Sequence, residues 1–266
     1  MEIDHRYTPD ETYNTPTPGS WSRAWQSDPM GGELNEEWGR LIDTFRSTAP
    51  LGSLAPDFEQ ERLGGGTWRL SDLLGKKSVL IVFGCYACPP CVTNVRTSNP
   101  SLVSLYEIYK QDIEFCYVYT REAHPGQKIV PHTSMEDKRR LAQRLQDEEQ
   151  LTFPLVIDDI EGTTQRSYVD PHFNNPVFLV NRAGIISYKS AWLDSSELPQ
   201  VLEDQVLWDK RSQTDKTIKK TFSERIRLLH EPFDGNCNAR IKRLMGEIGL
   251  AQAAMGAIPG VDSEKM

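Results

Sequence analysis

The chain has 266 residues, of which 38% are hydrophobic and 26% are charged, a composition that fits one globular domain with added segments and excludes a fibrous or fully disordered protein. Acidic residues outnumber basic ones by 38 to 30, and the net charge of -8 makes nucleic acid an unfavourable partner. The first 50 residues contain no apolar run of signal-peptide length, and no stretch of about 18 apolar residues occurs, so a soluble, cytoplasmic protein without membrane association is expected.

The N-terminal segment, residues 1–50, is expected to be a partly irregular extension, because it is rich in Thr, Pro, Gly and charge and shows little periodicity. One short helix is predicted in it, over ELNEEWGRLIDTF (33–45). The pattern changes from Ala55 onwards. Ser71 is predicted to cap a short helical turn over LSDLLGKK, and the apolar run SVLIVFG (78–84) is typical of a strand buried on both faces.

Helical and strand-like segments then alternate along the chain. CVTNVRTSNPSLVSLYEIYKQ has helical spacing that Pro100 should break, and IEFCYVY (113–119) is typical of a second buried strand. SMEDKRRLAQRLQDEE (134–149) predicts a helix capped by Ser134 together with Asp137. FPLVIDD, PVFLVN and GIISYKS predict three further strands, the last two joined as a hairpin by the turn RAG, and SSELPQVLEDQVL predicts a closing helix.

This order, β-α-β-α-β-β-α, predicts an α/β fold with a central mixed sheet and helices on both faces, which is the arrangement of thioredoxin-type domains. Residues 51–207 are expected to form this domain. Residues 208–266 are expected to be a C-terminal helical extension, with helices over 215–230 and 238–257. Their apolar faces are expected to pack on the domain or on a second copy of the chain, as in a homodimer.

Three of the five cysteines lie within FGCYACPPC (83–91), between a predicted strand and a predicted helix. Cys88 is therefore placed at a helix N-terminus, where unpaired N–H groups and the helix dipole favour an anion, and is predicted to be the most readily ionised thiol. CxxC thiols at helix starts have pKa values of roughly 3.5 to 7.5, compared with about 8.5 for a free cysteine. Cys91, one turn later, is predicted to resolve the disulfide that Cys88 forms, and the two prolines between them suit a first helical turn. This chemistry requires a Cys88 sulfur that solvent can reach.

Metal binding and simple burial are the competing interpretations of these cysteines. An iron–sulfur cluster lacks its expected fourth cysteine nearby, and a zinc site lacks a second CxxC or HxxxH pair, so no metal is expected. Cys85, at the strand end, is interpreted either as a buried residue or as an auxiliary thiol. Cys116 is predicted to be a core residue, and Cys237 an ordinary residue at a helix start.

The segment from APDF to CPPC (55–91) resembles the opening of the thioredoxin-like redoxins. The resemblance extends to NNPVFLVNRAGII (174–186), which is similar to the loop where thioredoxins place a cis-proline before a hairpin. It implies that Pro176 is cis, faces Cys88 and Cys91, and contributes to substrate binding.

A narrower resemblance, over residues 55–205, is to the iodothyronine deiodinases and their microbial relatives. It rests on VFG followed by a reactive position and Pro-Pro, on VYTREAHPG, on HTSMEDKRRLAQRL and on IISYKS. The resemblance implies that Cys88 takes the place of the selenocysteine of that family, and that Glu122, His124 and His132 are its active-site acid and histidines. Independently, Glu122 and His124 follow a strand and should lie at the carboxyl edge of the sheet, where a histidine can accept the proton of Cys88. His132 is expected to bind substrate or to cap the following helix.

These observations predict a cytoplasmic thiol oxidoreductase in which Cys88 is the nucleophile and Cys91 the resolving thiol. The expected substrate is a disulfide-containing protein or a small oxidised or halogenated electrophile, with no bound cofactor and with an external thiol reductant system to reset the pair. Thiol peroxidase and reductive dehalogenase are the enzymatic alternatives, although the peroxidase pattern PxxxTxxC has Cys85 at its Thr position. The alternative of another class is a non-catalytic metal-binding or assembly module.

Overall fold

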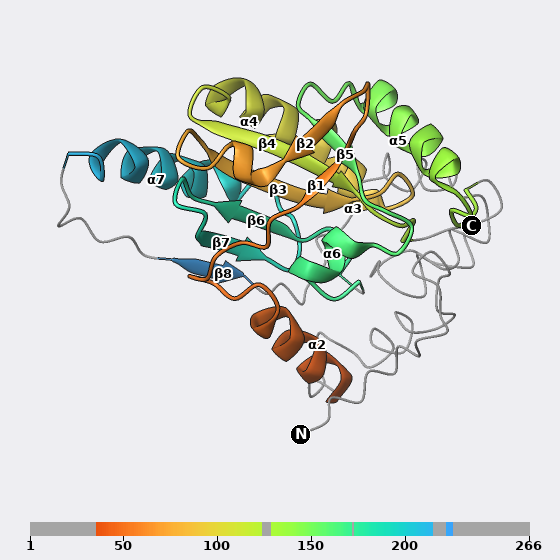
Figure 1. Ribbon diagram of the computed structural model, residues 1–266, viewed down its shortest axis with the longest axis horizontal. Helices are drawn as coiled ribbons and strands as arrows, with labels where there is room; N and C mark the ends of the chain where they lie inside the picture. The colour runs from red at the N-terminus through yellow and green to blue at the C-terminus, as the bar shows by residue number, and fades with distance from the viewer. Residues whose placement is uncertain (1–35, 124–128, 172, 215–221, 226–266) are drawn as a thin grey trace.

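A computed structural model of the protein describes residues 36–123, 129–171, 173–214 and 222–225. Within these residues the chain forms one sheet with helices on both faces (Figure 1). The strands are β1 (Glu59–Arg62), β2 (Thr67–Arg69), β3 (Ser78–Gly84), β4 (Ile113–Tyr119), β5 (Leu155–Ile157), β6 (Val177–Val180), β7 (Ile186–Ser190) and β8 (Ser223–Arg225). The α-helices are α2 (Glu36–Ser47), α3 (Pro89–Val92), α4 (Leu102–Tyr109), α5 (Met135–Glu149), α6 (Thr163–Tyr168) and α7 (Leu198–Arg211).

The sheet is mixed, with the order β2-β1-β5-β4-β3-β6-β7-β8. The central strands β3, β4 and β5 are parallel, and β6 joins β3 in the antiparallel sense before the hairpin to β7. The predicted thioredoxin-like α/β fold is confirmed. Because β3 and β4 are parallel and Gly84 pairs with Tyr119, the carboxyl ends of both strands meet at one edge of the sheet.

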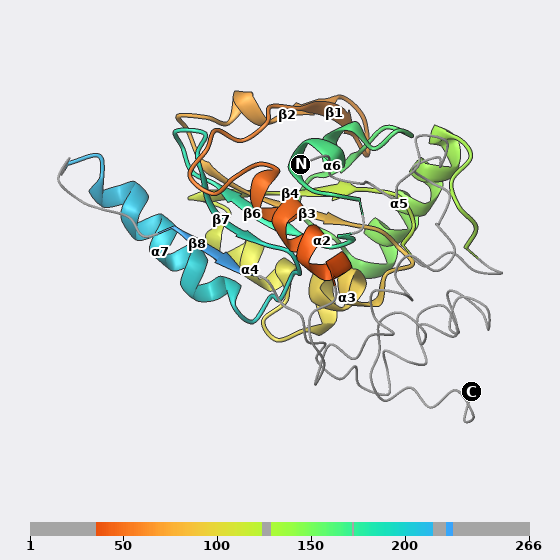
Figure 2. The same ribbon diagram turned by 90° about the horizontal axis from the view of Figure 1, so that it is seen from below.

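Two apolar layers hold the sheet between the helices. All seven residues of β3 are buried, because alternate side chains enter opposite layers. Leu80 and Val82 pack in the layer covered by α4, α5 and α7, whereas Ile81 and Phe83 pack in the layer that holds Phe45 of α2 and aromatic residues near α6. Figure 2 shows the strands β3, β4, β6 and β7 between α4 and α7 on one side and α6 on the other. A run buried on both faces cannot alternate with polar residues, which explains the continuous apolar pattern.

Serine caps fix where two of the helices begin. The Ser101 and Ser104 side chains form a reciprocal capping box at α4, and the Ser134 hydroxyl accepts the N–H of Asp137 at α5, as predicted. The predicted break near Pro100 is also present, since α3 and a π-helical turn over Thr93–Thr97 end before α4 begins. Ser71, predicted to be a cap, instead lies inside a short 3-10 helix (Leu70–Asp72) that has no side-chain cap.

Three features of the fold were not predicted from the sequence. The β1–β2 hairpin turns through adjacent glycines with positive φ, and α6 is a helix of only six residues. The third is β8, which corrects the helix predicted over 215–230, because Ser223–Arg225 pairs in parallel with β7. Glu224 in this strand lies 3.4 Å from the ammonium of Lys189. Strand pairing and this charge contact, rather than the helical spacing of the local sequence, decide the conformation of Ser223–Arg225. The helix predicted over 238–257 lies outside the described residues.

Lys189 of β7 joins the two ends of the described chain. Its side chain is fully buried, and its ammonium donates to the carbonyls of Phe45, Arg46 and Ala49 at distances of 2.6 to 3.4 Å. The carbonyls of Phe45 and Arg46 belong to the last turn of α2, which a cation stabilises, and Ala49 follows just after the helix. Since Glu224 contacts the same ammonium, one buried charge connects α2, β7 and β8.

None of the described helices combines the length and the apolar composition needed to cross a lipid bilayer.

Candidate active site

Three thiols meet in the loop between β3 and α3. The sulfur atoms of Cys85, Cys88 and Cys91 all lie within 4.8 Å of one another. Val92 donates its N–H to the Cys88 carbonyl at 3.2 Å, so Cys88 lies directly before the first helical turn, where the sequence pattern places it. The sharp passage from a strand into a helix brings residues three and six positions apart together. We call these three residues the thiol cluster.

The thiol cluster is buried. Cys85 and Cys88 have no exposed surface and Cys91 has 1%, and Ala123 completes the small apolar group around them. The requirement that solvent reach the Cys88 sulfur is therefore not met in this structure. Prolines at the first two helical positions donate no N–H, so Cys91 is the first residue of α3 that can donate to the Cys88 sulfur.

Burial and mutual hydrogen bonding shift the pKa values of the three thiols in different directions. Burial raises the pKa of both Cys85 and Cys88 well above the ordinary value. Burial acts on Cys91 in the same sense, but the thiols of Cys85 and Cys88 donate to its sulfur, as does the Cys85 N–H, and together they hold the pKa of Cys91 well below the ordinary value. In this buried arrangement the pKa shifts favour charge on Cys91, whereas the sequence pattern predicts it on Cys88. The reason is that hydrogen bonds within the cluster outweigh the helix N-terminus.

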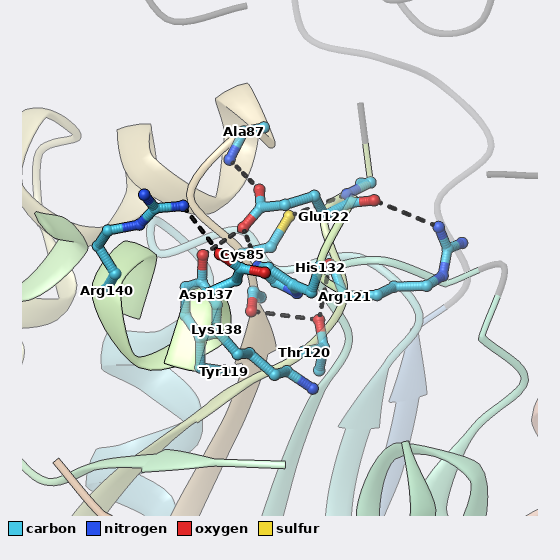
Figure 3. A network of polar contacts seen from close by, with 12 residues as sticks. Cys85, Ala87, Tyr119, Thr120, Arg121, Glu122, His132, Asp137, Lys138 and Arg140 are labelled. Carbon is cyan, nitrogen blue, oxygen red and sulfur yellow. Dashed lines mark hydrogen bonds and ion pairs between the residues drawn. The ribbon is translucent and has the colours of Figure 1, made fainter. Parts of the chain in front are cut away.

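Glu122 connects the loop of the thiol cluster to the next strand (Figure 3). One carboxylate oxygen accepts the N–H of Ala87 at 2.7 Å, and the other accepts the Tyr119 hydroxyl and lies 3.3 Å from Nε2 of His132. Burial would raise the pKa of Glu122, but these contacts, led by the one with His132, lower it below the ordinary value. Since Ala87 lies between Cys85 and Cys88, the carboxylate fixes the loop that carries them.

His132 is buried against Glu122 rather than exposed to a substrate. Its side chain has no exposed surface, and its ring lies 5.8 Å from the ring of Tyr119. Nδ1 of His132 has no hydrogen-bond partner among the described residues. The alternative interpretation of His132 as a helix cap is wrong, because Ser134 caps α5. His124, the other histidine of the deiodinase resemblance, lies outside the described residues.

The loop before β6 approaches the cluster from the opposite side. The carbonyl oxygen of Asn174 lies 3.9 Å from the Cys91 sulfur, and the carbonyl of Pro176 accepts the N–H of Phe83 at 3.0 Å. The implied cis bond is not found before Pro176, where the peptide is trans, and is found instead between Asn99 and Pro100. A trans X-Pro bond is the commoner isomer, and only the resemblance had favoured cis.

Sequence analysis missed Tyr117 as a residue of this site. Its hydroxyl is buried without a hydrogen-bond partner among the described residues. A Cβ placed on Gly84 would overlap this hydroxyl and would lie 3.1 Å from the Cys91 sulfur, so the hydroxyl and the cluster meet at Gly84. Alternation along β4 puts Tyr117 and Tyr119 on one face, a signal that was available in IEFCYVY. Cys116, which directly precedes Tyr117, points into the opposite layer and is the core residue that was predicted.

Replacing Glu122 by glutamine is expected to lower the free energy of unfolding by about 2 kcal/mol at pH 7, because charged hydrogen bonds are lost in a buried place. The folded-state pKa lies below 4.5, so the contribution of the carboxylate is complete above about pH 4.5 and disappears as the pH falls through the folded-state pKa. Denaturant unfolding should therefore show a smaller difference in the free energy of unfolding between the wild type and Glu122→Gln below pH 4 than at pH 7. Glu136→Gln, at an exposed position of α5, is the matched control, and a difference that stays constant with pH would contradict the prediction.

Comparison with known proteins identifies related sequences. The family described as AhpC/TSA matches residues 51–189, just over half of the chain. The thiol-disulfide oxidoreductase ResA of Geobacillus kaustophilus is 36% identical over 142 residues, which cover 53% of this chain and 69% of that protein. The ResA protein of Geobacillus thermodenitrificans is 34% identical over 116 residues, which cover 43% of this chain and 55% of that protein.

Solved structures with a similar course of the chain include thiol-disulfide proteins. The thioredoxin domain of a thiol-disulfide oxidoreductase from Bacteroides vulgatus is 23% identical, with a TM-score of 0.46, and the match covers 59% of this chain and 97% of that one. A thiol:disulfide interchange protein from Bacteroides sp. is 21% identical, with a TM-score of 0.47, and the match covers 63% of this chain and 97% of that one.

Proposed function

Because the chain belongs to the AhpC/TSA family, we propose that it is a thiol-disulfide oxidoreductase in which Cys88 attacks a disulfide and Cys91 resolves the intermediate. The observation that carries the proposal is the position of the two sulfurs, within 4.8 Å of each other across the start of a helix at the carboxyl edge of the sheet. The similarity to ResA proteins, which are thiol-disulfide oxidoreductases, supports the same reaction.

The proposed reaction transfers two electrons from the cysteine pair to the substrate. The Cys88 sulfur bonds to one sulfur of the substrate disulfide, the substrate S–S bond breaks, and the other substrate sulfur leaves as a thiol. Cys91 then attacks the Cys88 sulfur, the mixed disulfide breaks, and the second substrate thiol leaves. The protein is left with a Cys88–Cys91 disulfide. An external dithiol reductant reverses the two steps on the protein, which regenerates both thiols and oxidises the reductant.

The contacts of the cluster supply the proton transfers. The Cys88 thiol donates to the Cys91 sulfur, so the proton that Cys88 loses on attack has an acceptor in place. The buried Glu122 carboxylate lies close enough to Cys85 and Cys91 to raise the pKa of Cys85 and to oppose the lowered pKa of Cys91. We expect Glu122 to act as a positioning residue, because its hydrogen bond to Ala87 fixes the loop between the cysteines.

Burial of Cys88 makes substrate attack dependent on a local opening of the loop. In the closed state the thiols are protected from unselective oxidation, because only an accessible thiolate reacts readily. We propose a reducing, cytoplasmic location for this chemistry, with a thiol system as the electron donor and a disulfide-containing protein or small molecule as the substrate.

The proposal is tested by titrating the free thiols of the full chain before and after mild oxidation with a small disulfide. The expected result is a loss of two of the five thiols, with peptide mapping that assigns the bond to Cys88 and Cys91. Dithiothreitol should restore all five, and the oxidised protein should reduce no further disulfide. Five thiols that survive oxidation, or a disulfide between other cysteines, would overturn the proposal.

Reductive dehalogenation is a second candidate, favoured by the buried contact between Glu122 and His132 beside the thiols. In that reaction an aryl halide and two thiols give the unsubstituted arene, a disulfide and hydrogen halide, with the acid and the histidine handling the proton. Release of iodide from an iodophenol by the reduced protein would distinguish this function from disulfide exchange alone.

A further inference from the structure

We propose that the reduced thiol cluster also binds a thiophilic d10 cation, Cu(I) or Zn(II), through the sulfurs of Cys85, Cys88 and Cys91. The site would exist independently of the oxidoreductase activity. A consequence that does rest on the proposed function is that the metal and the Cys88–Cys91 disulfide exclude each other, because both use the same two sulfurs.

The geometry of the cluster fits three sulfur ligands around one ion. Each cysteine offers one sulfur, and all three sulfurs lie within 4.8 Å of one another. Sulfurs bound to one metal at about 2.3 Å would be roughly 4 Å apart, so binding requires only small side-chain shifts. The sequence had argued against a metal because no fourth cysteine is near, but it did not show that the third thiol, Cys85, faces the other two.

The chemistry of the surroundings selects a soft ion over a hard one. The only ligand atoms in the cluster are sulfurs, which favour Cu(I) and Zn(II) over magnesium or calcium. The nearest acid, Glu122, already accepts the Ala87 N–H and the Tyr119 hydroxyl and lies against His132, so its oxygens are engaged elsewhere.

Backbone donors point at each sulfur and support negative charge on it. Ala123 donates its N–H to the Cys85 sulfur at 3.2 Å, Cys91 donates to Cys88, and Cys85 donates to Cys91. Hydrogen bonds of this kind orient metal-bound thiolates and offset part of their charge.

The Tyr117 hydroxyl is an independent sign of a ligand. It is fully buried, has no hydrogen-bond partner among the described residues, and meets the cluster beside the Cys91 sulfur at Gly84. An unpaired buried hydroxyl is costly and needs a partner. A metal-bound thiolate would accept its hydrogen bond.

Cys85 separates this proposal from the proposed function, since disulfide exchange uses only Cys88 and Cys91. The reduced full chain would be titrated without oxygen against Zn(II) and, separately, Cu(I), each in competition with a chromogenic chelator. One equivalent is expected to bind, and Cys85→Ser is expected to weaken binding by about 100-fold or more, beyond the typical effect of losing an outer-shell contact. Cys116→Ser, which removes a buried thiol in the opposite apolar layer, is the matched control and should bind as the wild type does.

Each metal arm gives a decisive result. Binding of Cu(I) alone supports a three-sulfur site, and binding of Zn(II) supports a site completed by a fourth ligand. X-ray absorption of the wild-type complex, which needs no variant, should show three sulfurs at about 2.3 Å from zinc. The proposal would be overturned if neither metal bound at one equivalent, if the bound metal had fewer than three sulfur neighbours, or if a folded Cys85→Ser variant bound with the affinity of the wild type.

Failure of this site and failure of the proposed function are distinguishable. A protein that forms the Cys88–Cys91 disulfide but binds neither metal keeps the oxidoreductase function and loses the metal site. A protein that binds metal but keeps all five thiols under oxidation does the reverse. Where both hold, the oxidised protein is expected to have lost its metal affinity, and equal affinity in both redox states would contradict mutual exclusion.

Discussion

Cys88→Ser is expected to lower the turnover of disulfide reduction by more than about a thousand-fold, the scale of loss that follows removal of a catalytic nucleophile. A serine hydroxyl keeps the shape of the side chain but does not form a bond with a disulfide sulfur. Steady-state reduction of a model disulfide with excess dithiothreitol measures the effect. Cys116→Ser, in β4 and away from the cluster, is the control and should retain full turnover.

Cys91→Ser is expected to stop the same reaction one step later. Cys88 still attacks, but no thiol resolves the intermediate, so a mixed disulfide between Cys88 and the substrate should accumulate and be visible by mass spectrometry. The low pKa of Cys91 makes the reverse assignment testable as well. If a mixed disulfide formed on Cys91 in Cys88→Ser and none on Cys88 in Cys91→Ser, the roles of the two thiols would be exchanged. Full turnover in Cys88→Ser would rule out the mechanism.

Lys189→Met is expected to lower the free energy of unfolding by about 3 kcal/mol or more, the scale for removing one partner of a buried charged network. Methionine keeps the length and apolar stem of lysine, so the loss isolates the ammonium group. The carbonyls at the end of α2 and the Glu224 carboxylate would lose their common donor. Denaturant unfolding followed by circular dichroism measures the change.

Lys210→Met provides the matched control for this substitution. Lys210 lies on α7 with 59% of its side chain exposed and contacts Asp112 at 3.2 Å. Exposed ion pairs contribute little, so a change of about 0.5 kcal/mol or less is expected. Equal effects of the two substitutions would show that the buried ammonium does not stabilise the fold.

Much of the fold could be predicted because long apolar patterns decide it. β3 and β4 are continuous apolar runs, and α5 has both a cap and a buried face, so each was recognisable alone. The β1–β2 hairpin could not be recognised, since its strands are short and polar and only Trp68 on β2 is buried. β8 depends on β7 and Lys189, which lie far away in sequence, and its three residues carry no strand pattern of their own.

The location of the site could be predicted from the sequence, but not which of its thiols is ionised. Spacing alone brought Cys88 and Cys91 to a helix start and Glu122 to the same sheet edge. Which thiol ionises depends on the burial of the three sulfurs and on the direction of the hydrogen bonds between them. Neither can be read from the CxxC spacing. The contribution of Tyr117 likewise depends on Gly84, which leaves space for the hydroxyl only once β3 and β4 are paired.

The buried ammonium of Lys189 also limits how the molecule can be shortened. The region shared with the family ends at residue 189, so a fragment with those boundaries would omit α2, α7 and β8. It would expose the apolar face that α7 covers and leave β7 as an open edge, which invites aggregation. We therefore expect the stretch that folds cooperatively to extend beyond the stretch that the family shares.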